Sequence, residues 1–499
     1  MNYRFDVVFT FSQVYQTCKP KIANMKVLIG EFVMSPYGGI AAYVTEIIKG
    51  FKSLGCDVDL FRLSPSKITQ KAYDAKCAEL KSGDYKYKSS SGFEYDANVG
   101  YWCNSIEGYM LPPSNRIPVY EEGALEQWHK LADTADIVLW NFLPTHNRAW
   151  EGKNGQPFDY WYKFFDLPSS VSQVYIVHDI SPDKRNTYLS VLKDKIVFLA
   201  VAHLVGYKCC ENIGIPRSLL LNPRFLDEKK SPATPMKSRE VDFFAGHIFK
   251  PVKHLEEYIR AIPYINAKKQ HTCWLAGAGI EQNYMTAPVK IKPRYICSKT
   301  YDPDLDPALE GKVTIWNRAL ECGMEYFGLL SVSQVSDVLD NAKFAIDPQY
   351  SPYGSLHGRT HINGFIIEAL VHGTYPVIRD YRGITPESLT VEDPIFDVME
   401  KIAIPWDATP KQFAQMLKGA LRMDPEKYLA DTDHNYKVAL ELFNARANAE
   451  EIIRICKGGK KYVNKHLECG EDSPEVQKST NKMMEEFFHI PLPLKWENK

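Results

Sequence analysis

Short β-branched runs, each followed by a stretch with helical periodicity, occur in both halves of this chain and constrain its fold more than any other feature. In the first half we predict strands at 26–32, 57–63, 136–142, 173–178 and 196–201, with an amphipathic helix at 41–54. Alternating strands and helices are typical of βαβ units that build a parallel sheet. The first half therefore predicts a Rossmann-like domain.

The same pattern restarts after residues 227–240, a charged stretch interrupted by prolines that is typical of a linker. Beyond it we predict strands at 241–245, 272–276, 343–346 and 376–378, and helices at 254–265 and 362–371. The tail from about residue 410 has helical periodicity, including residues 436–455. The prediction is an α/β chain with an extension at 1–24, Rossmann-like domains at 25–226 and 241–425 that face each other across a cleft, and a C-terminal helical segment at 426–499.

The charge balance limits the classes of function. The 499-residue chain carries 60 Lys and Arg against 61 Asp and Glu, so it lacks the basic field of a tight nonspecific nucleic-acid binder. No apolar run reaches the roughly 18 residues that span a bilayer, and the N-terminus lacks a signal-peptide pattern. The eleven cysteines are scattered, which argues against a disulfide framework or a zinc site. We expect a cytoplasmic protein with no membrane partner.

Two adjacent glycines, Gly38 and Gly39, separate the first predicted strand from the first helix. Such a turn lets backbone N–H groups and the positive end of a helix approach a phosphate. The three spaced glycines of the dinucleotide fingerprint are absent. Gly38 and Gly39 are therefore candidate donor-binding residues, and an ordinary tight turn is the alternative.

A stronger signal lies in the second half, where a helical run contains Glu368 and ends in Gly373 and Thr374 before Pro376. A glutamate here can accept hydrogen bonds from both ribose hydroxyls of a nucleotide, and the turn can pack beside a diphosphate. This run resembles the donor site of the large retaining group of GT-B glycosyltransferases. Glu368, Gly373 and Thr374 are donor-binding candidates, with a surface glutamate before an ordinary helix–strand turn as the alternative.

Two further segments narrow the resemblance. Residues 136–144 and 174–186 are similar in order and spacing to the corresponding strands of the DNA α-glucosyltransferases of T-even phages. The resemblance spans most of residues 25–455. It implies transfer of a sugar, glucose or arabinose, from a UDP-sugar donor to 5-hydroxymethylcytosine in double-stranded phage DNA, with no cofactor required.

The resemblance also implies roles for particular residues. His178 and Asp179 would form the catalytic pair at the end of a first-domain strand, where a histidine or carboxylate can hydrogen-bond the acceptor hydroxyl or the sugar. A core histidine and a helix cap are the alternatives for these two residues. The first domain would bind the acceptor, and the second would bind the nucleotide-sugar.

Three positions depart from the pattern of the group. The loop after the first strand of the second domain commonly carries an Arg and a Lys for the diphosphate, and His247 stands where the Arg is expected. Lys253 is the candidate for the lysine, one residue late, with Lys250 as its rival. The acid expected eight residues before Glu368 is absent, and Arg359 beside that position is a candidate phosphate ligand.

Other features are assigned to the surface or left open. The acidic loop 302–306 resembles a metal-binding Asp-x-Asp motif, but its flanking prolines favour a rigid, solvated loop and we expect no metal. Basic clusters at 67–88, 290–299 and 457–465 are by default solvated, yet they are the places where a DNA backbone could be held. Aromatic-rich insertions at 83–118 and 149–168 are expected to be packed core or an acceptor platform.

Two other interpretations remain open. One is a GT-B transferase that acts on a polysaccharide, lipid or protein acceptor, which the neutral net charge favours. The other is a nucleotide-sugar epimerase or a non-catalytic nucleotide-sugar-binding protein, which the altered diphosphate loop keeps open.

Overall fold

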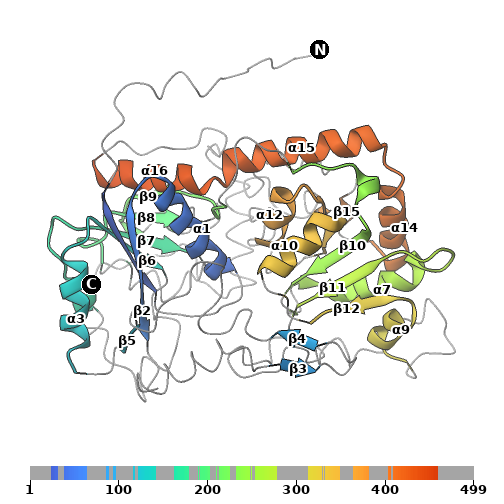
Figure 1. The fold of residues 1–499 in the computed structure, drawn as a ribbon, viewed down its shortest axis with the longest axis horizontal. Helices are drawn as coiled ribbons and strands as arrows, with labels where there is room; N and C mark the ends of the chain where they lie inside the picture. Colours follow the sequence, from blue (N-terminus) through green and yellow to red (C-terminus); the bar gives the residue numbers. More distant parts are fainter. Residues whose placement is uncertain are drawn as a thin grey trace, which may run out of the picture.

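A computed structural model of the protein describes residues 24–31, 39–64, 86–88, 94–96, 116–118, 122–141, 162–178, 189, 192–202, 210, 213–224, 232–247, 249, 253–277, 313–328, 330, 332–348, 364–380, 403–405 and 408–458. These residues form two larger sheets and one short two-stranded sheet. Figure 1 shows the two larger sheets side by side, each flanked by helices, with the C-terminal helices running along both.

The first sheet has seven parallel strands in the order β5-β2-β1-β6-β7-β8-β9. This confirms the predicted parallel organisation of the first half. The order reverses between β1 and β6, and ligands of doubly wound sheets bind at the carboxyl ends of strands beside such a switch point. The strands are β1 (Lys26–Glu31), β2 (Asp57–Ser64), β5 (Arg116–Pro118), β6 (Ile137–Asn141), β7 (Ser172–Val177), β8 (Phe198–Val201) and β9 (Arg217–Leu219).

Apolar side chains cover both faces of this sheet. Trp140 shows how tightly one face is packed, because its ring centroid lies 5.1 Å from that of Trp128 and 4.1 Å from that of Phe165. Its indole N–H donates to Oε1 of Gln173 at 3.0 Å, so the buried polar atom is satisfied. Burial on both faces explains why strands such as β6 and β8 are nearly continuous apolar runs. The covering elements include α1 (Gly39–Ser53), α3 (Ala124–Ala132) and the 3-10 turn η5 (Lys163–Phe165).

The second sheet has six parallel strands in the order β12-β11-β10-β13-β14-β15, and its order reverses between β10 and β13. The strands are β10 (Val241–Gly246), β11 (Cys273–Ala276), β12 (Met324–Tyr326), β13 (Ala342–Asp347), β14 (Tyr375–Asp380) and β15 (Ile404–Pro405). The helices around it include α7 (Leu255–Ile265), α9 (Ile315–Glu321), α10 (Val332–Asn341), α12 (Gly364–Val371) and α14 (Pro410–Ala420).

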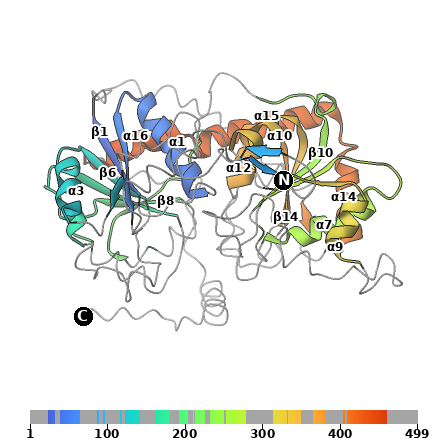
Figure 2. The ribbon, with the colours of Figure 1, turned by 60° about the horizontal axis from the view of Figure 1, so that its bottom comes forward.

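The last two described helices divide the C-terminal segment between the sheets, as Figure 2 shows. α15 (Pro425–Leu442) packs on α12 of the second unit. α16 (Ala445–Cys456) packs on α1 and joins the core of the first unit. The contact with α1 is close, because a Cβ added at Gly50 would lie 2.2 Å from the carbonyl oxygen of Ala445. The chain therefore crosses back to the first unit between α15 and α16.

That crossing interrupts the helix predicted over residues 436–455. Asn444 has an extended backbone, and its Oδ1 accepts hydrogen bonds from the N–H groups of Arg446 and Ala447 at 2.9 and 3.3 Å. An asparagine that caps a new helix offers the backbone an alternative to continuing the old one. Asn444 also forms a parallel bridge with Arg224, which lies just before the predicted linker.

Arg239 is a buried residue in the described part of the linker, and sequence reasoning did not single it out. Its Nη1 donates to the carbonyls of Leu339 and Ala342 at 2.7 and 2.9 Å, and its Nη2 donates to those of His372 and Gly373 at 2.9 and 2.8 Å. These carbonyls lie at the C-terminal ends of α10 and α12 and at the start of β13. Arg239 therefore donates hydrogen bonds to carbonyls that the ends of these helices leave without a partner inside the helix, at the amino edge of the second sheet.

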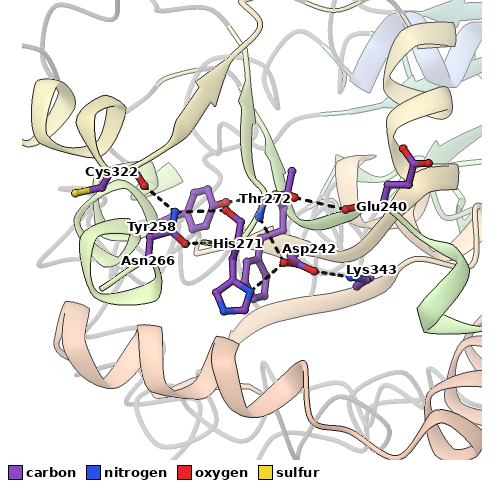
Figure 3. A network of polar contacts seen from close by, with 9 residues as sticks. Glu240, Asp242, Tyr258, Asn266, His271, Thr272, Cys322 and Lys343 are labelled. Carbon is purple, nitrogen blue, oxygen red and sulfur yellow. Dashed lines mark hydrogen bonds and ion pairs between the residues drawn. The ribbon is translucent and has the colours of Figure 1, made fainter. Parts of the chain in front are cut away.

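A second polar network lies along the same amino edge, and Figure 3 shows it. Asp242, near the start of β10, accepts a hydrogen bond from Nζ of Lys343 at 2.5 Å and lies 3.0 Å from Nδ1 of His271. Asn266 accepts from the backbone N–H of His271 at 2.8 Å and donates to the carbonyl of Cys322 at 2.7 Å. The network ties β10, β13 and the approach to β11 together at the edge that precedes the strands.

The short two-stranded sheet lies within the aromatic-rich insertion 83–118. Its strands, β3 (Lys86–Lys88) and β4 (Glu94–Asp96), pair antiparallel and place Tyr87 opposite Tyr95. Among the residues that the structure describes, no helix combines the length and the apolar character needed to cross a membrane.

Candidate functional site

The carboxyl ends of the central strands bring candidate residues of the second unit together. β10 ends at Gly246 and is followed by His247, and the neighbouring β13 ends at Asp347. The strand order reverses between these two strands, which is where ligands bind in open α/β sheets. His247 therefore lies where the sequence placed the donor loop, and Asp347 joins it from a distant part of the chain.

The imidazole of His247 is buried beside Asp347. Its Nε2 lies 3.1 Å from Oδ1 of Asp347, and the two side chains are 4% and 8% exposed. Burial lowers the pKa of His247 below 6.5, a nearby Lys253 lowers it further, and Asp347 opposes both effects without cancelling them. The ring is therefore neutral at pH 7, so it can form hydrogen bonds but does not supply a full positive charge.

Lys253 brings a positive charge close to this position. It is partly buried, directly before the left-handed residue that precedes α7, and it acts on the pKa of His247. The N-terminus of α7 adds a partial positive charge from its unpaired N–H groups. Lys253 and this helix end are therefore the described groups that can stabilise a diphosphate, whereas Lys250 and Arg359 lie outside the described residues.

Close backbone contacts fix the loop that carries His247. Gly277 follows β11 with φ of 136°, and a Cβ added there would lie 1.7 Å from the carbonyl oxygen of His247. Only glycine fits this approach and this backbone conformation. Sequence reasoning missed Gly277, although two glycines spaced by one residue, Gly277 and Gly279, directly after a predicted strand are the signal that could have found it.

Helix α12 places Glu368 beside this loop. Phe365 lies three residues earlier on the same face of α12, and its ring packs edge-on against His247 with centroids 4.9 Å apart. The side chain of Glu368 is 20% exposed, and its Oε1 lies 2.7 Å from Nε of Arg224. The structure thus places Glu368 on the helix that packs against His247 and pairs it with an arginine that the sequence did not indicate.

Gly373 and Thr374 lie elsewhere. The turn that they form precedes β14, so it lies at the amino edge of the sheet, opposite the edge that carries His247. Thr374 is 1% exposed and its hydroxyl donates to the carbonyl of Leu339 at 2.5 Å. Gly373 has φ of 62° and packs against the backbone of Pro232. The structure does not bring these two residues together with the other donor candidates, and it gives them a role in holding the sheet edge.

The carboxyl edge of the first sheet holds a second group of polar side chains. Asn141 ends β6, His178 follows β7, and Nε2 of His178 forms a hydrogen bond with Oδ1 of Asn141. An amide oxygen can only accept, so Nε2 carries the proton and Nδ1 of the neutral ring is the acceptor. The ring of His178 also lies edge-on to Tyr43 of α1, with centroids 4.7 Å apart. Asn141 therefore selects the tautomer in which His178 can receive a hydrogen bond from a hydroxyl.

Two buried donors at this edge have no hydrogen-bond partner among the residues that the structure describes, namely Nδ2 of Asn141 and the hydroxyl of Tyr43. Burial raises the pKa of Tyr43, so its hydroxyl stays protonated at neutral pH. Buried polar groups are normally paired with protein, water or a ligand. The edge can therefore both donate to and accept from the hydroxyls of a bound molecule.

The remaining candidates are only partly described. Gly39 is the first residue of α1, whereas Gly38 and Asp179 lie outside the described residues, as do the acidic loop 302–306 and most of the basic clusters. Within the described part of the chain, no group of three or more His, Cys, Asp or Glu residues is arranged to hold a metal ion.

No protein-family model matches the chain, and a search of curated proteins also found no match. Solved structures are similar in fold. An alpha-glucosyltransferase in complex with UDP-glucose and DNA containing an abasic site aligns with a TM-score of 0.54 and 13% identity, over 87% of this chain and 100% of that chain. An alpha-glucosyltransferase with UDP and a 13-mer DNA containing a HMU base gives 0.55 and 12% over the same shares of the two chains.

A variant of TarM from S. aureus, in complex with Fondaparinux, alpha-GlcNAc-glycerol and UDP, aligns with a TM-score of 0.50 and 11% identity, over 87% of this chain and 99% of that chain. The likeness covers both sheets of the chain and most of each solved structure. The chain therefore has the two-domain, Rossmann-like α/β fold of the GT-B glycosyltransferases.

Proposed function

We propose that the protein is a glycosyltransferase that binds a UDP-sugar through its second unit. The observation that carries this proposal is the group of side chains at the β10–β13 switch point. His247 and Asp347 end the two strands, and α12 packs Phe365 on His247 while it presents Glu368 on the same face. A carboxylate one helical turn from a diphosphate loop suits the ribose of a nucleotide, because it can accept from both hydroxyls.

The proposed donor site needs no metal to balance the diphosphate. Lys253 supplies a full positive charge, the N-terminus of α7 supplies a partial one, and the neutral His247 supplies a hydrogen bond. These groups would stabilise the charge that grows on UDP as the bond between the sugar and the diphosphate breaks. Alpha-glucosyltransferase structures of similar fold are complexes with UDP or UDP-glucose, which supports this choice of donor.

For the acceptor, we propose 5-hydroxymethylcytosine in double-stranded DNA. His178 would receive a hydrogen bond from the acceptor hydroxyl at Nδ1, because Asn141 holds the proton on Nε2. A base inside a duplex cannot reach such a site, so it must be rotated out of the stack at a cost of a few kcal/mol, which phosphate contacts would offset. Several solved structures of similar fold contain DNA, which supports this acceptor over others.

In a retaining reaction the chemistry needs no protein nucleophile. The acceptor oxygen forms a bond to C1 of the sugar, the bond from C1 to the diphosphate oxygen breaks, and the hydroxyl proton passes to the departing UDP on the same face. The protein contributes by positioning the two substrates and by stabilising the charge on the diphosphate. Asp179 would lie beside His178 as a second polar group near the reacting hydroxyl.

The decisive experiment offers the acceptor and the donor together. The protein is incubated with UDP-glucose or UDP-arabinose and a hydroxymethylated duplex, and the digested nucleosides are analysed by mass spectrometry, with an unmodified duplex as the control. We expect a nucleoside heavier by one sugar only with the hydroxymethylated duplex. Transfer to glycan, lipid or protein acceptors but not to DNA would favour the alternative transferase. UDP-sugar binding without any transfer would favour a non-catalytic binding protein, and conversion of the sugar alone would indicate an epimerase.

A further inference from the structure

Arg224 lies where the chain passes between the two units. It follows β9 of the first sheet, and its backbone pairs with the crossing between α15 and α16. The N–H of Arg224 donates to the carbonyl of Phe443, and the carbonyl of Arg224 accepts from the N–H of Ala445 at 2.8 Å. Because α15 packs on the second unit and α16 on the first, Arg224, the last described residue before the linker, pairs with the crossing between these two helices.

The side chain of Arg224 reaches from this crossing to the candidate donor helix. It is 4% exposed, its Nη1 donates to the carbonyl of Pro223 at 2.7 Å, and its Nη2 donates to the carbonyl of Gly364 at 3.3 Å. Its Nε lies 2.7 Å from Oε1 of Glu368. Gly364 and Glu368 are four residues apart on α12 and so lie on one face of that helix. The guanidinium of Arg224 contacts both residues on this face.

The ion pair is not what holds α12 in place. Ile366, Ile367 and Leu370 of α12 pack into an apolar cluster with Val438 and Ala439 of α15, and this cluster anchors the helix. The ion pair instead fixes the carboxylate of Glu368, because a rigid guanidinium that is itself held by two carbonyls leaves one carboxylate oxygen little freedom. The second oxygen of Glu368 then remains as the acceptor for ribose hydroxyls.

From this geometry we propose that Arg224 is the positioning residue for the ribose site, and that it links recognition of the ribose diol to the crossing between the two units. The inference rests on the proposed function, because it takes Glu368 as the ribose acceptor. Arg224 acts through Glu368 and does not touch the donor itself. A nucleotide that binds Glu368 would thereby act on Arg224, whose backbone also pairs with the crossing between α15 and α16.

The test compares UDP with 2′,3′-dideoxy-UDP, which lacks both ribose hydroxyls, by calorimetric titration. For the wild-type protein we expect UDP to bind at least about tenfold more tightly, since hydrogen bonds to a charged group are lost with the dideoxy compound. Arg224→Ala should reduce this preference to about twofold or less while it leaves the affinity for the dideoxy compound nearly unchanged. A residue that only stabilises the fold would weaken both ligands alike and keep their ratio.

Three further variants make the result interpretable. Combining Arg224→Ala with Glu368→Ala should give the same preference as Glu368→Ala alone, because the two side chains act as one unit. Arg224→Lys keeps the charge and should retain part of the preference, which covers the case in which Arg224→Ala does not fold. Arg446→Ala removes an exposed arginine close to the same crossing, whose Nε lies 3.3 Å from Oε1 of Glu450, and should behave as wild type.

The outcomes separate the two levels of the proposal. If Arg224→Ala and Arg224→Lys keep the wild-type preference while Glu368→Ala loses it, the role of Arg224 is overturned and the donor site stands. If Glu368→Ala also keeps the preference, or the wild-type protein binds neither nucleotide, the donor site itself is wrong.

Discussion

Replacing Glu368 with glutamine isolates the charge of the proposed ribose acceptor. The glutamine keeps the length of the side chain and an oxygen that can still face Arg224. Glu368→Ala would instead leave the guanidinium of Arg224, which is only 4% exposed, without its ion pair. An unpaired buried charge costs several kcal/mol of stability, so the alanine variant would mix lost stability with lost binding. Glutamine is therefore the sharper substitution when the affinity for UDP alone is measured, whereas a ratio between two nucleotides cancels a loss that is common to both.

The expected magnitude follows from the change of acceptor. Hydrogen bonds to a charged group contribute about 1.5–3 kcal/mol and neutral ones about 0.5–1.5 kcal/mol. Glu368→Gln should therefore weaken UDP binding by about 1–2 kcal/mol, which is roughly 5- to 30-fold in Kd. Because 20% of the Glu368 side chain is exposed, solvent screening favours the lower half of that range.

Calorimetric titration with UDP and thermal denaturation together measure this effect. We expect a higher Kd for Glu368→Gln with a Tm close to that of the wild type. Glu450→Gln, which neutralises an exposed glutamate on α16 that is 39% exposed, is the matched control and should leave both quantities unchanged. A Kd for Glu368→Gln within about twofold of the wild-type value would refute the assignment of Glu368 to the ribose.

Four further changes test other parts of the interpretation. Lys253→Ala should depress turnover more than Lys250→Ala, because Lys253 lies close enough to act on the pKa of His247; equal losses, measured as initial rates, would show that the diphosphate lysine is misplaced. His178→Ala should abolish transfer while its affinity for hydroxymethylated duplex stays close to that of the wild type. For both proteins this affinity should fall at least about tenfold between about 50 and 200 mM salt, as phosphate contacts require. Normal turnover of the variant, or an affinity that does not depend on salt, would contradict the acceptor site. Thr374→Val should lower the free energy of unfolding by about 0.5–1.5 kcal/mol, because the buried carbonyl of Leu339 keeps Nη1 of Arg239 as a donor but loses the hydroxyl of Thr374, with UDP affinity unchanged; a loss of UDP affinity at wild-type stability would return Thr374 to the donor site. Burial alone would raise the pKa of Asp242, but hydrogen bonds from Lys343 and His271 outweigh it and lower that pKa below 3.8. The stability that Asp242 contributes is therefore present above about pH 4 and lost as the pH falls through its folded pKa, so unfolding followed at decreasing pH should show a steeper loss for the wild type than for Asp242→Asn.

The local sequence pattern was sufficient for the architecture. Continuous apolar runs such as β6 and β8 must be buried on both faces, and alternation with amphipathic helices leaves a parallel sheet as the economical solution. The same pattern placed Glu368 on a helix and His178 at the end of a strand, because both positions depend only on neighbouring residues. It misjudged the run 436–455, where the capping geometry of Asn444 and its bridge to Arg224 override helical periodicity.

Only the tertiary structure decided which polar side chains contact one another. Asp347 reaches His247, Asn141 reaches His178, and Arg224 reaches Glu368 through contacts between residues far apart in the chain, and no local spacing records such contacts. For the same reason the sequence grouped Gly373 and Thr374 with Glu368, although Glu368 lies on α12 and the turn at 373–374 lies beyond the helix, at the amino edge of the sheet. A helix advances about 1.5 Å per residue, so a few positions in sequence are enough to separate a binding edge from a structural one.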